Sequence, residues 1–280
     1  MLPASHKSPT GDCELCFILG IDYRSGTNHL YQLLRLHPQC VGLAPIWEDF
    51  VLHHSHHLHS YVQSLFGSWN PKWKVDEQVG TRAELLRSFG VVLENFLMKQ
   101  ARGDSSESST RRFITKTPSV EGLDNFFELF PNAIPIVLIR DGRCVVESGM
   151  KSFGWDFQQA SERWRRRARK ILEFESSPHA ASRPWLKVRF EDLVRDEQGC
   201  MTAILKGLGL DVELYDFQRA GELKILGGSQ TAQKSGDLHW RSTDKPTDFD
   251  PTQRISHWTD EQREQFNKIA GEEFRLLGYQ

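Results

Sequence analysis

The feature that most constrains this chain is an apolar strand near its start that leads through a short polar loop into a helix. Residues Leu15–Gly20 form a run of strand-forming side chains that ends in glycine. Residues 27–37 then place leucines at helical spacing, and Pro38 ends the pattern. A strand followed so closely by a helix is the repeating unit of a parallel sheet.

The same alternation continues along the chain. Further strands are expected at residues 113–115, 134–140 and 185–189, and further helices at residues 122–130, 143–151, 200–208 and 260–277. This order favours an α/β fold with a single domain, in which a central parallel sheet carries helices on both faces. We place the domain at residues 15–279, after a polar tail at 1–14.

Composition excludes several functions. The 35 basic and 37 acidic side chains give a net charge of −2, so no global positive field attracts nucleic acid and any anion site must be local. Five cysteines are few and odd in number for a disulfide framework, and Cys13 and Cys16 form one pair with no second pair to complete a zinc site. With no long apolar run and a polar start, we expect a cytoplasmic protein without a membrane span. The oligomeric state stays open.

The loop after the first strand has the outline of a phosphate site. Backbone N–H groups at a helix start, with a glycine and hydroxyl side chains, bind anions. A nucleoside-triphosphate loop needs a lysine after its second glycine, but Thr27 stands at that position, so hydrolysis of ATP or GTP is disfavoured. An ordinary turn between strand and helix is the alternative. The candidate residues are Arg24, Ser25, Gly26, Thr27 and Asn28.

A second basic turn follows a later strand. Residues 134–139 end at Arg140, and Asp141 and Gly142 lead into a helix that carries Ser148. Two anion sites at one sheet edge suit a ligand that is phosphorylated at both ends.

Several short motifs then follow one another in a characteristic order. They are Arg-Ser-Gly-Thr at 24–27 with Leu-His-Pro at 36–38, Lys-Thr-Pro at 116–118, Leu-Phe-Pro-Asn-Ala at 129–133, Arg-Asp-x-Arg with a later serine at 140–148, Val-Arg-Phe-Glu-Asp-Leu at 188–193, and Leu-Gly-Tyr at 277–279. This series resembles the sulfotransferases that use 3′-phosphoadenosine 5′-phosphosulfate (PAPS). The resemblance spans residues 15 to 279 and implies their fold, which is similar to that of P-loop nucleoside triphosphatases.

The resemblance also implies an activity. The chain would move a sulfuryl group from PAPS to an acceptor hydroxyl or amine, with no metal required. Arg24 and the N–H groups of residues 25–28 would hold the 5′-phosphate, and Arg140 with Ser148 would hold the 3′-phosphate. A loop containing Ser229, Lys234 and Lys245 resembles the segment that closes over the donor in this family.

Two residues are expected to act at the transferred group. Lys116 leaves its strand between the two phosphate sites and could reach the bridging oxygen, although a surface lysine before a turn would look the same. Glu48 is our candidate for the general base, with Asp49 and His53 as competitors. The structural alternative for Glu48 is a helix-capping acid before a helix at 49–58.

The sequence departs from the family pattern at three places. Asp22 and Tyr23 replace a pair that ends in proline, Asn28 replaces a second threonine, and Phe190 replaces a tyrosine. Phe190 can pack on a base, but it cannot donate a hydrogen bond to a phosphate.

Other conspicuous side chains have plainer interpretations. Five histidines at positions 53, 54, 56, 57 and 59 have no carboxylate or cysteine to complete an obvious metal set, so we expect them to face solvent or the acceptor. The basic run 163–170 is typical of a solvated helix face or, alternatively, of contact with an anionic acceptor. Trp69, Trp73 and Trp155 either pack in the core or line a cleft that binds the acceptor.

Two other functions remain open at this stage. A small-molecule kinase on the same type of sheet would demand magnesium and ATP. A silent nucleotide-binding protein would have kept the fold without the chemistry. The acceptor is undetermined among sugar hydroxyls, phenols, steroid-like alcohols and peptide tyrosines, because variable loops form acceptor pockets.

Overall fold

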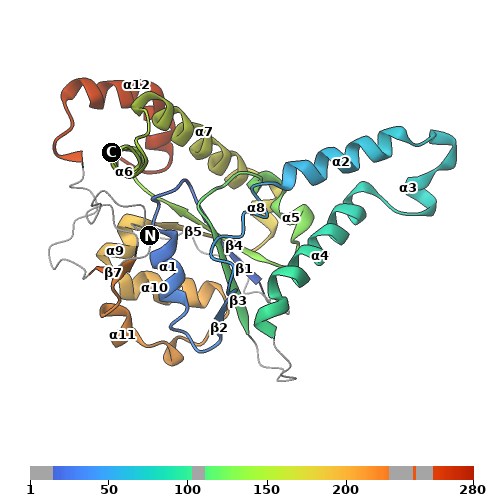
Figure 1. Ribbon diagram of the computed structural model, residues 1–280, viewed down its shortest axis with the longest axis horizontal. Helices are drawn as coiled ribbons and strands as arrows, with labels where there is room; N and C mark the ends of the chain where they lie inside the picture. The colour runs from blue at the N-terminus through green and yellow to red at the C-terminus, as the bar shows by residue number, and fades with distance from the viewer. Residues whose placement is uncertain (1–14, 103–110, 227–241, 244–254) are drawn as a thin grey trace.

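A parallel sheet of five strands forms the centre of the computed structural model, which describes residues 15–102, 111–226, 242–243 and 255–280 (Figure 1). The strand order is β2-β3-β1-β4-β5, and all four pairings are parallel. The strands are β1 (Leu15–Gly20), β2 (Cys40–Gly42), β3 (Arg112–Thr117), β4 (Ile134–Ile139) and β5 (Leu186–Arg189). The expected α/β fold with a central parallel sheet is confirmed.

Helices cover both faces of the sheet. The first part of the chain contributes α1 (Thr27–Leu34), α2 (Ser55–Ser68), η1 (Pro71–Trp73), α3 (Val75–Gln78), α4 (Arg82–Arg102), η2 (Leu123–Asn125), α5 (Phe126–Leu129) and α6 (Gly142–Phe153). The second part contributes α7 (Phe157–Glu175), α8 (Pro178–Ser182), α9 (Phe190–Arg195), α10 (Glu197–Gly207), η3 (Val212–Leu214), α11 (Phe217–Gly221) and α12 (Asp260–Leu276). A short antiparallel pair, β6 (Ile225–Leu226) with β7 (Ser242–Thr243), lies outside the main sheet.

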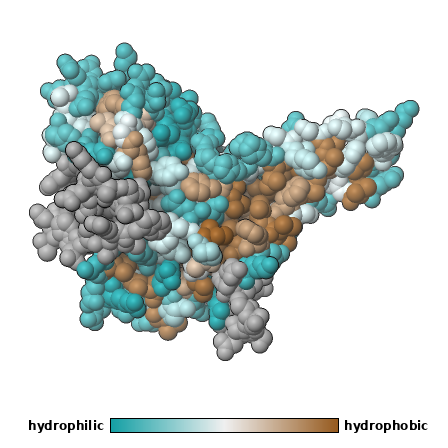
Figure 2. Space-filling view, in the orientation of Figure 1, coloured by the Kyte–Doolittle hydropathy of each residue, from teal (hydrophilic) through white to brown (hydrophobic). Residues whose placement is uncertain are grey.

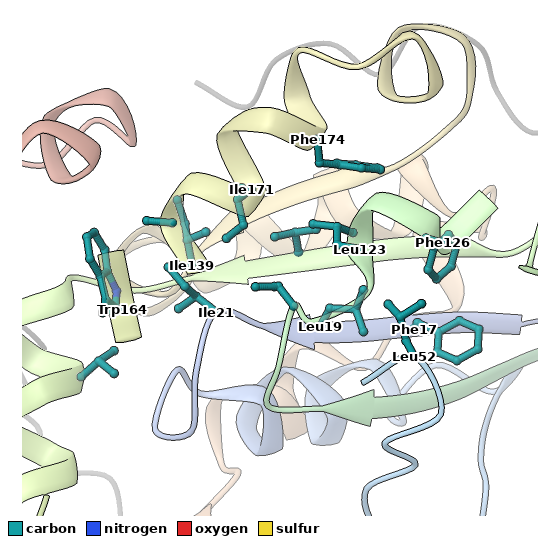
Figure 3. Close-up of a cluster of buried hydrophobic side chains, with 14 of the residues drawn as sticks. Phe17, Leu19, Ile21, Leu52, Leu123, Phe126, Ile139, Trp164, Ile171 and Phe174 are labelled. Atoms are coloured by element: carbon teal, nitrogen blue, oxygen red, sulfur yellow. The ribbon is translucent and has the colours of Figure 1, made fainter. Parts of the chain in front are cut away.

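Alternating side chains of the central strands supply two separate cores. Phe17 and Leu19 of β1 pack on one face of the sheet, whereas Cys16 and Ile18 pack on the other. The first core includes residues of α7 and α12, and Figure 3 shows Ile171 of α7 above the strands. The second core contains α1, α9 and α10. Because both faces are buried, β1 and β4 read as continuous apolar runs.

A helical arm extends from the body of the molecule. Helices α2 and α4 contact each other and, with α3 at the tip, project to the right in Figure 1. Brown, apolar surface gathers where the arm joins the body in Figure 2. Val92 and Phe96 of α4 are mostly exposed, at 64% and 66%. The sequence expectations did not include this arm, and the helix expected at 49–58 begins only at Ser55.

Candidate active site

The candidate residues meet at the carboxyl edge of the sheet. The loop after β1 contains Arg24, the end of β3 contains Lys116, and Arg140 follows β4 directly. In open α/β sheets, ligands bind outside the carboxyl ends of the strands, where the connections diverge to opposite sides. Here β1 has β3 on one side and β4 on the other, so the loop after β1 lies at that position.

The loop between β1 and α1 is shaped by glycine and by its own hydrogen bonds. Gly26 precedes α1 with a φ of 98°, and a Cβ there would lie 2.3 Å from the Phe190 ring. The Ser25 hydroxyl donates to the Asp22 carbonyl oxygen at 2.7 Å, and the Ser25 N–H donates to the same oxygen at 3.3 Å. Both Ser25 donors are therefore engaged within the loop, which fixes its curvature.

Two arginines and a serine converge beside this loop. Arg24 donates from Nε to Ser148 Oγ at 3.1 Å, and Arg140 donates from Nη1 to the Arg24 carbonyl oxygen at 2.7 Å. The Arg140 guanidinium lies 4.4 Å from the centre of the Phe190 ring. Burial and the neighbouring Arg140 charge lower the pKa of Arg24 to about 10, so Arg24 is still charged at neutral pH.

Arg140 has donors that the described part of the chain does not use. The residue is only 4% exposed, and its Nε and Nη2 atoms are buried without a hydrogen-bond partner among the described residues. Buried guanidinium donors without partners are costly, and a second cation close by adds to that cost. An anion with several acceptor oxygens would accept hydrogen bonds from these donors and would offset the repulsion between the two cations. The residues present therefore fit a phosphate.

The first turn of α1 completes this side of the site. Among the residues that the structure describes, no side chain caps α1 at its amino end, and Thr27 is buried. Asn28 Oδ1 is buried with no hydrogen-bond partner among the described residues. Ser229, Lys234 and Lys245, expected to form a closing loop, lie outside the described residues.

An ion pair stands at the end of β3. Lys116 Nζ lies 3.1 Å from Glu48 Oε1 and 4.7 Å from the centre of the Trp47 ring. The Lys116 side chain is fully buried, whereas a quarter of the Glu48 side chain is exposed, at 0% and 25% respectively. Burial lowers the pKa of Lys116, and the neighbouring Glu48 carboxylate opposes that shift. The pair places a cation and an accessible carboxylate together at the sheet edge.

Asp49 holds this segment against β3. Its Oδ2 accepts from Thr115 Oγ1 at 2.8 Å, its Oδ1 accepts from Val51 N at 2.9 Å, and its backbone N–H donates to the Lys116 carbonyl oxygen at 3.2 Å. Burial raises the pKa of Asp49, and these hydrogen bonds partly offset the increase. The carboxylate is thus tied to the protein, and Glu48 is the acid with free surface.

Comparison with known proteins bears on this arrangement. The family model described as "Sulfotransferase family" matches residues 16–214 of the chain. The chain belongs to the sulfotransferase family.

Solved structures resembling this sulfotransferase share little sequence with it. The sulfotransferase domain of the Synechococcus PCC 7002 olefin synthase is 23% identical, with 96% of this chain and 98% of that chain covered and a TM-score of 0.48. Mouse sulfotransferase SULT7A1 complexed with PAP is 13% identical, with coverages of 94% and 85% and a TM-score of 0.49. No curated protein matches the sulfotransferase. None of its described helices is long and apolar enough to cross a membrane.

The sequence expectation of a solvated face for residues 163–170 is wrong for two arginines of this sulfotransferase. Arg163 donates from Nε to Asp22 Oδ2 at 2.8 Å, and Arg167, which is 6% exposed, forms an ion pair with Asp22 Oδ1. In the sequence, Asp22 stands out only as a departure from the family pattern. An acidic residue in a loop expected to bind an anion is unusual, and that feature of the sequence could have prompted a search for basic partners.

The histidines and tryptophans are spread over different surroundings. His53 Nδ1 lies 2.8 Å from Ser119 Oγ, and His59 approaches Glu128 on α5. Within residues 15–102, 111–226 and 255–280, no group of three or more histidine, cysteine or acidic side chains is placed to hold a metal. Trp155 packs beneath Arg163, whereas Trp73 is 58% exposed on the arm. Trp69 packs against Phe66 on the arm.

Cys16 is a fully buried residue of β1 in the sulfotransferase. Its sequence partner Cys13 lies outside the described residues.

Proposed function

We propose that this sulfotransferase transfers a sulfuryl group from PAPS to an acceptor hydroxyl or amine. The observation that carries the proposal is the convergence of Arg24, Arg140 and Ser148 beside the loop after β1. Two donor atoms of Arg140 there have no hydrogen-bond partner among the described residues. Such a cluster suits a nucleotide with a phosphate remote from the transferred group. We further propose that the transferase domain spans residues 15–279, since Tyr279 donates to the buried Glu191 at 3.1 Å.

The donor, when bound, supplies an activated sulfuryl group whose departure leaves adenosine 3′,5′-bisphosphate. Arg140 and Ser148 would hold the 3′-phosphate, and Arg24 with the first turn of α1 would hold the 5′-phosphate. Phe190 holds the Arg140 guanidinium by packing against it. The Phe190 ring fits beside residue 26 only because that residue is a glycine and has no side chain.

Lys116 and Glu48 have separate tasks in this scheme. The Lys116 ammonium would stabilise negative charge that develops on the departing phosphate oxygen. Glu48 would accept the proton of the acceptor hydroxyl or amine, because its carboxylate has exposed surface while remaining anchored to Lys116. The buried position of Lys116 keeps the cation in a medium where its interactions are stronger than in water.

Nucleotide binding tests the proposal. Titration calorimetry without added metal should show binding of adenosine 3′,5′-bisphosphate and much weaker binding of adenosine 5′-monophosphate. At about 100 times its dissociation constant, the bisphosphate should add roughly 2.7 kcal/mol to the free energy of unfolding. Equal binding of the two nucleotides contradicts the assigned 3′-phosphate site. Binding of Mg-ATP alone favours a small-molecule kinase. A protein that binds the bisphosphate but transfers no sulfuryl group from PAPS to a panel of sugars, phenols, alcohols and amines is a catalytically silent nucleotide-binding protein.

A further inference from the structure

Asp22 is a fully buried carboxylate in the loop that would hold the 5′-phosphate. Its two oxygens contact Arg163 and Arg167 of α7, at 2.8 Å for Arg163 Nε and through an ion pair for Arg167 Nη1. A carboxylate beside an anion site opposes anion binding unless its charge is neutralised. Two guanidinium groups neutralise it here, so the acid is compatible with the proposed site.

The same residue determines the path of the loop. Asp22 Oδ1 accepts from the Tyr23 N–H at 2.7 Å, and the Asp22 carbonyl oxygen accepts from the hydroxyl and the N–H of Ser25. The side chain is therefore attached to α7 while the main chain holds the turn that leads to Gly26. Loss of the side-chain contacts would release the turn from its support.

Helix α7 is a firm support for this purpose. Ile171 and Phe174 bury their side chains in the first core, as Figure 3 shows. Arg167 Nε also lies 3.7 Å from Glu121 Oε1, and Lys170 Nζ lies 3.2 Å from Glu121 Oε2. The ionic network thus joins the loop after β1 to α7 and to the segment that follows β3.

We propose that Asp22 is a positioning residue for the donor, because it clamps the 5′-phosphate loop to α7 through Arg163 and Arg167. This inference rests on the proposed function for the identity of the ligand. The clamp predicts an effect on anion binding that is opposite to the effect expected from charge alone. Replacing Asp22 with asparagine removes a negative charge near an anion site, which by charge alone would strengthen anion binding. Loss of the clamp instead weakens it.

The test uses Asp22→Asn and two nucleotides that differ only at the 5′ position. Titration calorimetry should show that adenosine 3′,5′-bisphosphate binds about tenfold more weakly to the variant than to the parent. The affinity for adenosine 3′-monophosphate should differ by less than about twofold between variant and parent, because Arg140 and Ser148 are not part of the clamp. A general loss of structure would weaken the binding of both nucleotides equally.

Matched controls come from the same helix. Glu162→Gln removes one acidic charge next to Arg163, and Arg166→Gln removes one basic charge next to Arg167; Arg166 is exposed, and Glu162 contacts Gln158. Both controls should keep the ratio of the two nucleotide affinities. Arg163→Gln should reproduce the selective loss, and it keeps the proposal testable if Asp22→Asn does not fold.

Hydrogen exchange without ligand separates this inference from the proposed function. Amides of residues 23–28 should exchange about tenfold faster in Asp22→Asn or Arg163→Gln than in the parent, while the amides of β1 stay unchanged. If the parent fails to bind the bisphosphate but the exchange difference is present, the donor assignment is overturned and the clamp is supported. Unchanged exchange, or equal or tighter binding of the bisphosphate by Asp22→Asn, overturns the clamp.

Discussion

Lys116 and Glu48 meet at the end of β3 with their charged atoms 3.1 Å apart, and only Glu48 has surface exposed to solvent. The buried ammonium cannot leave without breaking its contact with the carboxylate and with the Trp47 ring, 4.7 Å from Nζ to the ring centre. The pair therefore presents one fixed cation next to one accessible carboxylate.

Lys116→Ala should lower turnover at saturating PAPS by roughly 10²–10³, equivalent to about 2.7–4 kcal/mol, because a charged donor to the leaving oxygen is lost. Affinity for adenosine 3′,5′-bisphosphate should change much less. Arg140→Ala is the matched comparison and should mainly weaken nucleotide binding. Rapid-quench kinetics and calorimetry separate the two effects, and one shared kinetic pattern in both variants would contradict the separate roles.

Glu48→Gln should bind the bisphosphate as the parent does and lose roughly 10²–10⁴ in turnover, since it cannot accept the acceptor's proton. The substitution should also move the alkaline limb of the pH–rate profile to lower pH. The Glu48 charge raises the pKa of Lys116, so its removal lets that pKa fall further, and the protonated lysine disappears at a lower pH. A pH profile of residual turnover checks this. Near-parental activity would remove the assignment and make Asp49→Asn and His53→Ala the next variants to measure.

Asp49→Asn should change how stability depends on pH. Burial raises the pKa of Asp49 in the folded state above that of the unfolded chain, so the folded state holds more protons between these two pKa values. This residue's contribution therefore makes the parent less stable as pH rises through that window. The asparagine variant should lack this component. Urea unfolding of both proteins from pH 4 to pH 7 gives the comparison, and parallel stability curves would show that Asp49 does not titrate in that window.

Gly26→Ala should weaken nucleotide binding by disturbing the loop. The φ of 98° is unfavourable for alanine, and the added Cβ would lie 2.3 Å from the Phe190 ring, so a cost of about 1–2 kcal/mol from the backbone alone is expected. Combining it with Phe190→Leu should relieve the clash but not the backbone strain. Calorimetric affinity within about twofold of the parent for Gly26→Ala would show that the loop adapts freely.

Strong local patterns made most of the fold predictable. Strand β1 has the expected bounds Leu15–Gly20, and the strands and helices around Arg140 and near the C-terminus lie where apolar periodicity placed them. Strand β2 has three residues and too little pattern to be found. The arm of α2 and α4 was missed because packing of one helix on the other, rather than a strong amphipathic signal, supports it.

The sequence alone determined the fold class and the family, because these depend on short motifs that follow individual strands. It also predicted a set of residues that could bind an anion, and that set stays a prediction. Tertiary structure decided which of those residues share one place. It set the distance between Lys116 and Glu48, which are far apart along the chain. It also left two Arg140 donor atoms without a hydrogen-bond partner in the part of the chain that the structure describes. It also turned Asp22 from an unexplained departure into the partner of Arg163 and Arg167. Such pairings arise from the crossing of a loop and a helix that are distant in sequence, and local periodicity carries no information about that crossing.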